Sequence, residues 1–426
     1  MQPRDTMRLY QTAARVWLTA AGFSLILPAT VRLEWWVPLH LVLLGAVSVA
    51  ISGAMQNFVA ALTATGPAPP WMVWAQFGLT NAGAALVVAG RSSGLLGLVA
   101  AGGTAFLAGI LLLGVIVLRA RRRALHLRHR IPVAMYVGAV SFVLVGGPIG
   151  ILLGTGAVHD GQTWLDLRSA HMVINVLGWV SLAIAGTLIT LLPTVLRVRM
   201  PAWHGKLTAG LFVFGVGVTA AGLALDVTAL AVAGGAAFAA GVAGLVVMVR
   251  RVLSTPRKWP VPVSAKHLLL ALGWFAAGAV WLLVALIRGV QWFAGADDLF
   301  VVVFAGGWIL QTLLGAWQYL LPMSRPGHPD ERRASLAAVE WGGTVQLVAL
   351  NVGLVLLALA ASRSGASVLA TVGAALALVG TAMALIKSWT YPILGRSTLL
   401  TRRSRPMWDP GARLAEAGGN VSDGKL

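Results

Sequence analysis

Two histidines are the residues of this chain best suited to chemistry inside a membrane. His40 lies about one turn into an apolar segment at 36–63, and His171 lies about one turn into another at 169–195. Imidazole is the usual protein ligand for haem iron and copper, and two rings at one depth can share or flank a cofactor. Asn175 follows His171 by four residues and therefore shares its helix face, where its amide can orient the imidazole. This pattern predicts a cofactor or metal site at His40 and His171, supported by Asn175.

Both segments are expected to run from outside to inside, which puts the two imidazoles ~6 Å below the outer surface at 1.5 Å per residue. The alternative interpretation is two unrelated interfacial histidines, each bonded to a neighbouring carbonyl or water. Two ligands alone do not define a metal site. Both interpretations therefore stay open.

Long apolar runs must position these residues. The sequence is 58% hydrophobic and only 11% charged, which is far from the composition of a soluble domain. Twelve runs are each long enough to cross a hydrocarbon core, for which ~20 residues suffice. They lie near 12–30, 36–63, 70–90, 94–118, 132–155, 169–195, 207–225, 228–249, 267–290, 298–321, 336–360 and 366–392. We expect an all-α polytopic membrane protein with one transmembrane domain over 1–392 and a polar tail over 393–426.

Basic residues indicate the orientation. If the first loop lies outside, the outer connections carry only five arginines, and the other 27 of the 32 Lys and Arg lie at cytoplasmic ends. Cytoplasmic enrichment of Lys and Arg is the orientation signal of membrane proteins. The expected protein is therefore a multi-pass protein of the plasma membrane with both termini, and the tail, in the cytoplasm. The five outer arginines are Arg32, Arg91, Arg168, Arg288 and Arg363.

Charge and cysteine content exclude several classes. The net charge of +19 is spread over short loops, so we expect contact with anionic lipid headgroups and no nucleic-acid partner. The chain has no cysteine, which excludes disulfides and thiolate metal sites. Gly146, Gly150 and Gly154 form a stripe that predicts close helix packing. No convincing internal repeat is evident.

Other polar and aromatic residues carry weaker predictions. The remaining histidines are expected at solvated surfaces; they are His126, His129, His159, His204, His267 and His328. Glu340 is the one carboxylate expected inside a span, where it either carries protons or pairs with Arg332, Arg333 or Lys387. Four tryptophans are expected deep in the bundle as core packing; they are Trp179, Trp308, Trp317 and Trp341.

Three of the segments together resemble a known group. The motifs run from His40 through Gln56-Asn57-Phe58, from Ala170-His171 through Asn175 and Gly178-Trp179 to Pro193, and from Gly306-Gly307-Trp308 through Gln311 and Gly315 to Pro322. They resemble actinobacterial twelve-span membrane proteins related to the haem-copper oxidase catalytic subunit I and the NnrS group. The resemblance implies a haem-copper-oxidase-like bundle that binds haem or copper near the outer face, with His40 and His171 as ligands. Some relatives are fused to cupredoxin or copper nitrite-reductase-like domains, which implies a redox or cupredoxin-like partner.

The sequence differs from that group at several positions, and these differences limit the functions that the resemblance implies. Haem-copper oxidases carry further histidines on helices 7 and 10, which this chain lacks, and Asn57 stands where relatives tend to have histidine. An intact terminal oxidase is therefore not expected, and whether the chain is an enzyme stays open. The favoured hypothesis is a haem- or copper-binding membrane protein for electron transfer, cofactor handling or sensing. The alternatives are a cofactor-free transporter, with a cavity lined by amides of helices 3, 10 and 11 and Glu340 as coupling group, and an accessory membrane subunit.

Overall fold

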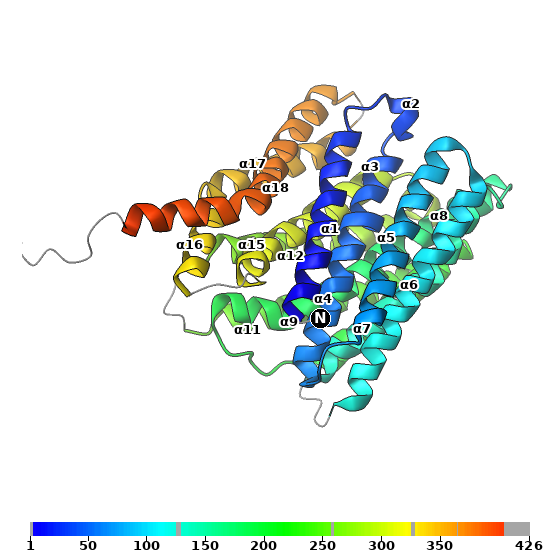
Figure 1. Cartoon of the computed structure of the whole chain (residues 1–426). Helices are drawn as coiled ribbons and strands as arrows, with labels where there is room; N and C mark the ends of the chain where they lie inside the picture. The colour runs from blue at the N-terminus through cyan, green and yellow to red at the C-terminus, as the bar shows by residue number, and fades with distance from the viewer. Residues whose placement is uncertain (1–2, 125–128, 257–259, 325–328, 364, 404–426) are drawn as a thin grey trace, which may run out of the picture.

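The protein is described here by a computed structural model of the chain (Figure 1). It describes residues 3–124, 129–256, 260–324, 329–363 and 365–403. Within these ranges all regular structure is helical. Eleven helices in the described part of the chain are long and apolar enough to cross a membrane, which confirms a polytopic helical protein. The predicted tail from 393 is reached only in part, because helix α18 continues to Arg403 and residues 404–426 lie outside the described ranges.

The helices follow one another in three groups of similar content, each of about four long helices. The first group comprises α1 (Pro3–Ser24), α2 (Ala29–Arg32), α3 (Trp36–His40), η1 (Leu41–Val47), α4 (Ser48–Thr63), α5 (Pro70–Ser93) and α6 (Leu96–Arg123). The second comprises α7 (Arg130–Gly154), α8 (Gly161–Met172), η2 (Val173–Ser181), α9 (Leu182–Leu196), α10 (Gly205–Ala224) and α11 (Thr228–Leu253). The third comprises α12 (Val263–Arg288), α13 (Val290–Ala294), α14 (Asp297–Phe300), η3 (Val301–Leu310), α15 (Gln311–Ser324), α16 (Pro329–Glu340), α17 (Gly343–Ala361) and α18 (Ser367–Arg403).

Most predicted spans are confirmed, with shifted ends. The segment predicted at 36–63 is a continuous helix over Trp36–Thr63, whereas the one predicted at 169–195 begins earlier and covers Gly161–Leu196. Its start is fixed by Asp160, whose carboxylate accepts the Thr163 N–H at 2.6 Å and caps α8. The extra turns before His171 correct the expectation that this residue lies only one turn into its helix.

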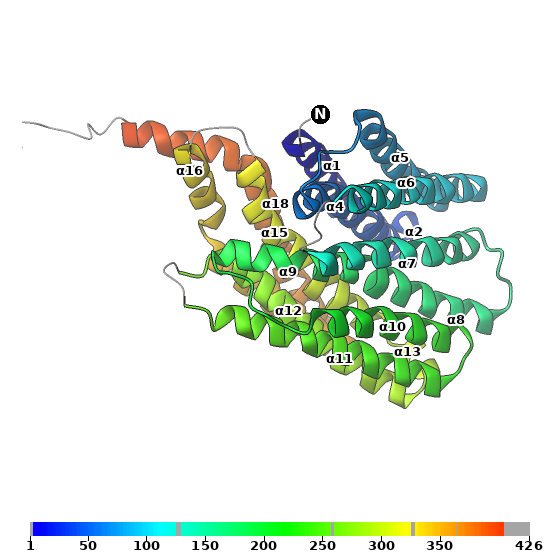
Figure 2. The same ribbon diagram turned by 90° about the horizontal axis from the view of Figure 1, so that it is seen from below.

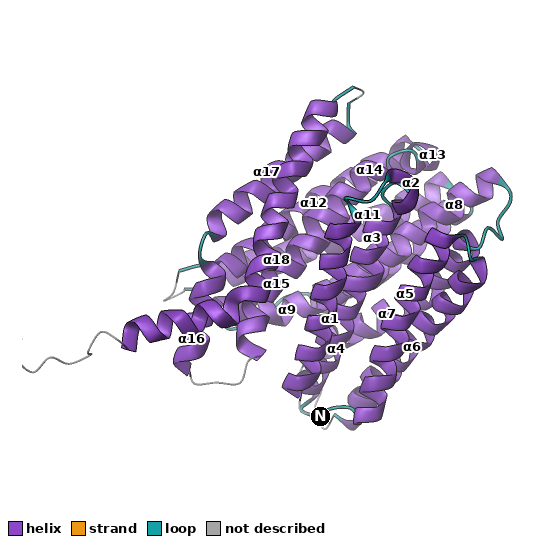
Figure 3. Ribbon diagram, turned by 45° about the horizontal axis from the view of Figure 1, so that its top comes forward, coloured by secondary structure: helices purple, strands orange, loops and turns teal. Residues whose placement is uncertain are grey.

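Two predicted spans differ more. The segment predicted at 336–360 is divided, because α16 ends at Glu340 and the span α17 begins at Gly343, with Gly342 in the left-handed conformation between them. Figure 3 shows α16 apart from α17, beside the last part of α18. The segment predicted at 12–30 is helix α1, which begins at Pro3 and is not among the eleven apolar spans.

A repeated contact between glycines and large side chains relates the three groups. Gly45, Gly178 and Gly307 lie 133 and 129 residues apart, and each is followed by a second glycine eight residues later. A Cβ on any of the first three would meet an aromatic ring at 2.5–2.6 Å, belonging to Trp17, Phe142 and Trp274 respectively. Each ring comes from the first long helix of the same group.

The second glycine of each pair repeats the pattern one level along the helix. Gly53, Gly186 and Gly315 face Tyr10, Met135 and His267, each seven residues before the ring named above. The third helices continue the correspondence in two groups. Trp17 Nε1 donates to Asn81 Oδ1 at 2.8 Å, and Trp274 Nε1 donates to Asn351 Oδ1 at 2.9 Å.

The last two helices of every group form a close pair. A Cβ on Gly83, Gly234 or Gly353 would meet the backbone of the partner helix at 2.2–2.5 Å. The chain is thus built from three corresponding units, residues 3–123, 130–253 and 263–403, which overturns the expectation that it has no repeat. Figure 2 shows the first unit, in blue and cyan, to one side of the other two.

The second helix of each unit contains a π-helical segment, and these segments meet. Trp179 Nε1 in η2 donates to Ser48 Oγ at 3.0 Å, and Trp308 Nε1 in η3 donates to Ser181 Oγ at 2.9 Å. Both hydroxyls in turn donate to the carbonyl five residues earlier in their own helix. The wider π-helical turn leaves such carbonyls without their usual partner. The helices Trp36–Thr63, Gly161–Leu196 and Asp297–Ser324 therefore lie together at the middle of the bundle. They are the second, sixth and tenth of the apolar segments predicted from the sequence and are called spans 2, 6 and 10 below.

Candidate functional site

His171 is held in a notch on α7 formed by two glycines. Its Nδ1 lies 2.9 Å from the Gly146 carbonyl oxygen, and its ring lies against Gly150, where a Cβ would come within 2.5 Å of Cε1. Asn175 packs over Gly146, where a Cβ would lie 2.6 Å from its amide nitrogen. The stripe predicted to serve helix packing thus seats the imidazole and its neighbouring amide.

Asn175 lies beside His171 as the four-residue spacing predicts. Its amide nitrogen donates to the His171 carbonyl oxygen at 2.8 Å and lies 3.1 Å from His171 Nδ1. Because the Gly146 carbonyl can only accept, the proton of the imidazole is on Nδ1. The Nε2 atom of His171 is then unprotonated, and its lone pair is free to bind a metal or accept a hydrogen bond.

His40 has the same arrangement in another span. Its Nδ1 lies 2.8 Å from the Trp36 carbonyl oxygen, one turn earlier, so Nδ1 again donates and Nε2 carries the lone pair. The ring stacks on the Trp36 indole with 3.9 Å between ring centres. Each histidine is the last or nearly the last α-helical residue before a π-helical segment, η1 or η2. Such segments are frequent at functional sites.

The two imidazoles lie within range of one another, although their helices belong to different units. A backbone carbonyl on Nδ1 is expected both for metal ligands, where it orients the ring, and for two unrelated histidines. Within the described residues neither Nε2 has a hydrogen-bond partner, and this free lone pair is what a cofactor requires.

The side chains available as ligands limit which metal or cofactor this site could hold. Among the described residues no cluster of three or more His, Cys, Asp or Glu side chains could hold a metal ion. Two imidazoles with free Nε2 atoms could hold a haem iron or a copper ion as nitrogen ligands. They do not fit a structural or catalytic site that needs three or four protein ligands.

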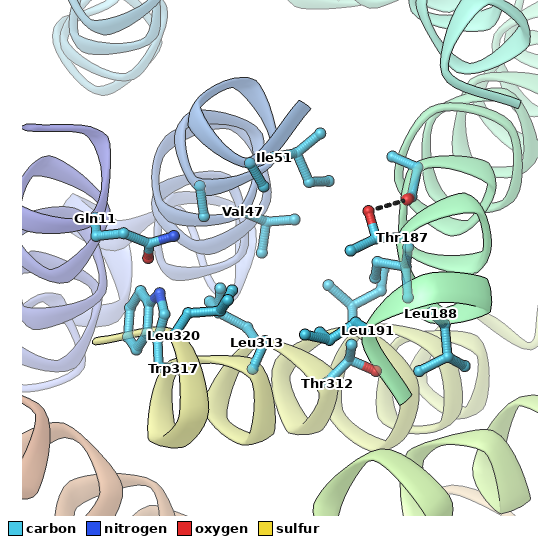
Figure 4. Close-up of a pocket in the computed structure, with 16 residues that line it drawn as sticks. Gln11, Val47, Ile51, Thr187, Leu188, Leu191, Thr312, Leu313, Trp317 and Leu320 are labelled. Atoms are coloured by element: carbon cyan, nitrogen blue, oxygen red, sulfur yellow. Dashed lines mark hydrogen bonds between the residues drawn. The ribbon is translucent and has the colours of Figure 1, made fainter. Parts of the chain in front are cut away.

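A small central cavity lies between spans 2, 6 and 10, away from both histidines. Its volume is about 70 Å³, and its wall is mostly aliphatic, with Ile51, Leu191 and Leu313 among the residues that face it (Figure 4). Among the described residues that line it, Gln11 has the only amide side chain, and Figure 4 shows it beside Trp317. The cavity expected for a transporter, lined by amides of helices 3, 10 and 11, does not correspond to this one.

Several other predictions about histidine are settled by burial. His159 and His204 are exposed as expected, whereas His126 and His328 lie outside the described residues. His267 was expected at a solvated surface, but it is completely buried. Its position explains the difference: it occupies the site on α12 that corresponds to Tyr10 and Met135, facing Gly315 of span 10.

Glu340 is also placed differently from the prediction. It is the last residue of α16, outside the described spans, where one carboxylate oxygen accepts the Val263 N–H at 3.0 Å at the start of α12. Burial raises the pKa of this carboxyl, and the Val263 N–H together with the charges of Lys266 and Lys387 opposes the rise. No ion pair joins it to Arg332, Arg333 or Lys387 within the described residues, so neither predicted role is confirmed.

The deep tryptophans are confirmed in three of four cases. Trp179, Trp308 and Trp317 are buried, and the first two bond the serines of neighbouring spans. Trp341 is 79% exposed, because it lies in the short connection between α16 and α17 rather than inside a span.

Comparison with known proteins adds no relative. No protein-family model matches the chain, and no curated protein is significantly similar to it.

Proposed function

We propose that this chain is a twelve-span membrane protein of haem-copper-oxidase-like architecture that binds haem or copper between His40 and His171 near the outer face. The observation that carries the proposal is the shared state of the two imidazoles. In both, Nδ1 donates to a backbone carbonyl and the Nε2 lone pair is free. The cytoplasmic location of both termini, the plasma membrane and a redox or cupredoxin-like partner belong to the same proposal.

The repeat supports twelve spans and a common depth. Helix α1 corresponds to α7 and α12, which are both apolar spans, so it crosses the bilayer despite its polar residues. Gly45 and Gly178 occupy corresponding places, and His40 and His171 precede them by five and seven residues. Two residues of helix correspond to about 3 Å along the axis. The imidazoles therefore belong at nearly one level.

A bound haem or copper would supply one-electron redox chemistry or a site for a small ligand. The protein's part is to hold and orient the ligands. The Gly146 carbonyl fixes the tautomer of His171, Gly150 leaves room for its ring, and the Trp36 indole supports the ring of His40. Both imidazoles are half-buried between the helices.

The alternative, a cofactor-free transporter or an accessory subunit, has less support from the geometry. Its expected coupling group, Glu340, caps the start of α12 outside the described spans. The central cavity is apolar rather than lined by amides.

The proposal is tested with protein produced under haem- and copper-replete conditions and purified in detergent. We expect a visible absorption band or about one equivalent of copper for an intact site, and loss of either in His40→Ala and in His171→Ala. His204→Ala is the matched control, because His204 is exposed and lies before α10. Wild-type protein with neither chromophore nor copper would refute the proposal.

A further inference from the structure

The three units differ sharply at one set of corresponding buried positions. These positions lie on the first, third and fourth long helix of each unit, and all nine residues are at most 7% exposed. The sets are Tyr10, Gln76 and Ile116 in the first unit, Met135, Thr208 and Met248 in the second, and His267, Gln346 and Lys387 in the third. The second unit shows that this fold accepts two methionines and a small hydroxyl side chain here, none of which can carry charge. The third unit instead buries two groups that can carry charge.

Hydrogen bonds join the three residues of the third unit, and the donor and acceptor of each bond can be assigned. Lys387 Nζ donates to Gln346 Oε1 at 2.9 Å, and Gln346 Nε2 lies 2.8 Å from His267 Nε2. Because the lysine can only donate, the glutamine oxygen faces it and the amide nitrogen donates to His267 Nε2. His267 Nε2 is therefore the acceptor, so this ring is neutral with its proton on Nδ1, and Lys387 Nζ is the donor.

A single amide cannot serve two cations. If His267 were protonated on Nε2, it would need the oxygen of Gln346, and the amide would have to rotate by half a turn. Its NH2 group would then face Lys387, which is favourable only when Lys387 is neutral. Two like charges on either side of one amide, in a poorly hydrated interior, also repel strongly.

We propose that His267, Gln346 and Lys387 form an intramembrane site that holds one exchangeable proton, on Lys387 or on His267 but not on both. In passing between the two states one N–H bond breaks at Lys387 Nζ and one forms at His267 Nε2, with no transfer of electrons. The total charge stays at +1, and the orientation of Gln346 differs between the states. This site is independent of the haem or copper site.

The surroundings point to exchange with water near Glu340. Glu340, at the end of α16, interacts electrostatically with both Lys387 and Lys266, and Lys266 is exposed one residue before His267. On the remaining sides the described neighbours are polar but uncharged, or basic. Span 10 contributes Gln311 and Gln318, α1 contributes Arg15 through its bond to the Ser388 carbonyl, and α18 contributes Tyr391.

Several buried atoms near the site have no hydrogen-bond partner among the residues that the structure describes. His267 Nδ1 is fully buried without a hydrogen bond, as are both amide atoms of Gln311 and of Gln318. Gln311 and Gln318 lie four residues before and three after Gly315, the residue against which His267 packs, so they share the face of α15 turned toward it. Buried polar atoms without hydrogen-bond partners are rare in well-packed cores. Several of them together favour a site whose hydrogen bonds rearrange.

Nitrogen NMR on protein with labelled histidine in lipid nanodiscs tests the proposal, with His267→Gln identifying the resonance among the eight histidines. We expect neutral His267 with its proton on Nδ1 at pH 7. In Lys387→Met the proton affinity of His267 should rise about tenfold or more, because the competing charge is gone. Lys266→Met removes an exposed charge next to His267 and should change that affinity less than about twofold.

Two results would overturn the proposal: a proton on Nε2 of wild-type His267, or equal effects of Lys387→Met and Lys266→Met. A second variant separates a proton site from a purely structural cluster. The triple change His267→Met, Gln346→Thr and Lys387→Met reproduces the residues of the second unit and should fold with an equal or higher melting temperature. Failure of this variant to fold would indicate that the cluster serves the fold.

Discussion

Gly150→Ala should empty the proposed cofactor site without altering either ligand. The new Cβ would lie 2.5 Å from His171 Cε1, whereas ordinary contacts begin near 3.4 Å, so the imidazole must move by about 0.9 Å. A shift of that size stretches the 2.9 Å bond from Nδ1 to the Gly146 carbonyl to about 3.8 Å, beyond hydrogen-bonding range. Loss of such an orienting bond typically lowers metal affinity by about 10- to 100-fold, or ~1.4–2.7 kcal/mol.

The assay is cofactor content of purified protein measured by optical spectrum and metal analysis, with melting temperature recorded on the same samples. Gly154→Ala is the matched control, because it lies one turn further along α7 and its Cβ would meet only a Val99 methyl at 3.0 Å. Both changes add the same methyl group to the same helix. Equal cofactor content in wild type and Gly150→Ala, or equal loss in both variants, would refute the role assigned to the notch.

Three further changes test the fold and one titration. Trp17→Phe removes the donor to Asn81 but leaves a phenyl ring like that of Phe142 in the second unit. The free energy of unfolding, measured with denaturant, should therefore fall by only about 1 kcal/mol. A variant that is already unfolded without denaturant would contradict the repeat. Ser181→Ala leaves the buried Trp308 N–H without its acceptor and should cost ~1–3 kcal/mol in the same assay, and an unchanged value would argue against the bond. Burial raises the pKa of Glu340 in the folded protein, so its contribution to stability is present below its unfolded pKa and is lost as the pH rises through the folded value. Glu340→Gln should therefore melt higher than wild type at pH 7, by a margin that narrows toward pH 4; a constant margin would contradict the raised pKa.

The apolar spans were readable from sequence because membrane crossing imposes a simple requirement of length and hydropathy. The helix at Trp36–Thr63 has the predicted ends, and most others agree to within a few residues. Helix α16 was missed because its Ala-rich second half joins smoothly to the apolar run of α17 in the sequence. Only the left-handed Gly342 reveals the break, and a glycine inside an apolar run is common in membrane helices.

Part of the candidate site could be predicted from the sequence. The spacing of Asn175 from His171 correctly predicted an interaction between their side chains, because residues four apart share a helix face. The carbonyl of Gly146 could not be predicted, since it comes from another helix and depends on how closely the two approach. Whether His40 and His171 hold one cofactor stays a prediction.

The repeat was detectable but was not found, because its signal is a spacing of glycines rather than similarity of neighbouring residues. Gly45 and Gly53, and the pairs that correspond to them, are separated by eight residues in each unit. The burial of His267 follows from the same spacing. It precedes Trp274 by seven residues, as Tyr10 precedes Trp17, and the shared position predicts a shared environment.

Correspondence between the units also separates features that the fold requires from features it only permits. Glycine facing a ring recurs in all three units, so it belongs to the packing of the bundle. The free imidazoles at His40 and His171 have Val302 and Phe300 at the corresponding positions of the third unit, so the fold does not need histidine there. Buried His267 and Lys387 have apolar counterparts as well. Because polar groups inside a membrane are costly where apolar ones fit, these two places are where this chain departs from its own pattern, and there its chemistry should be sought.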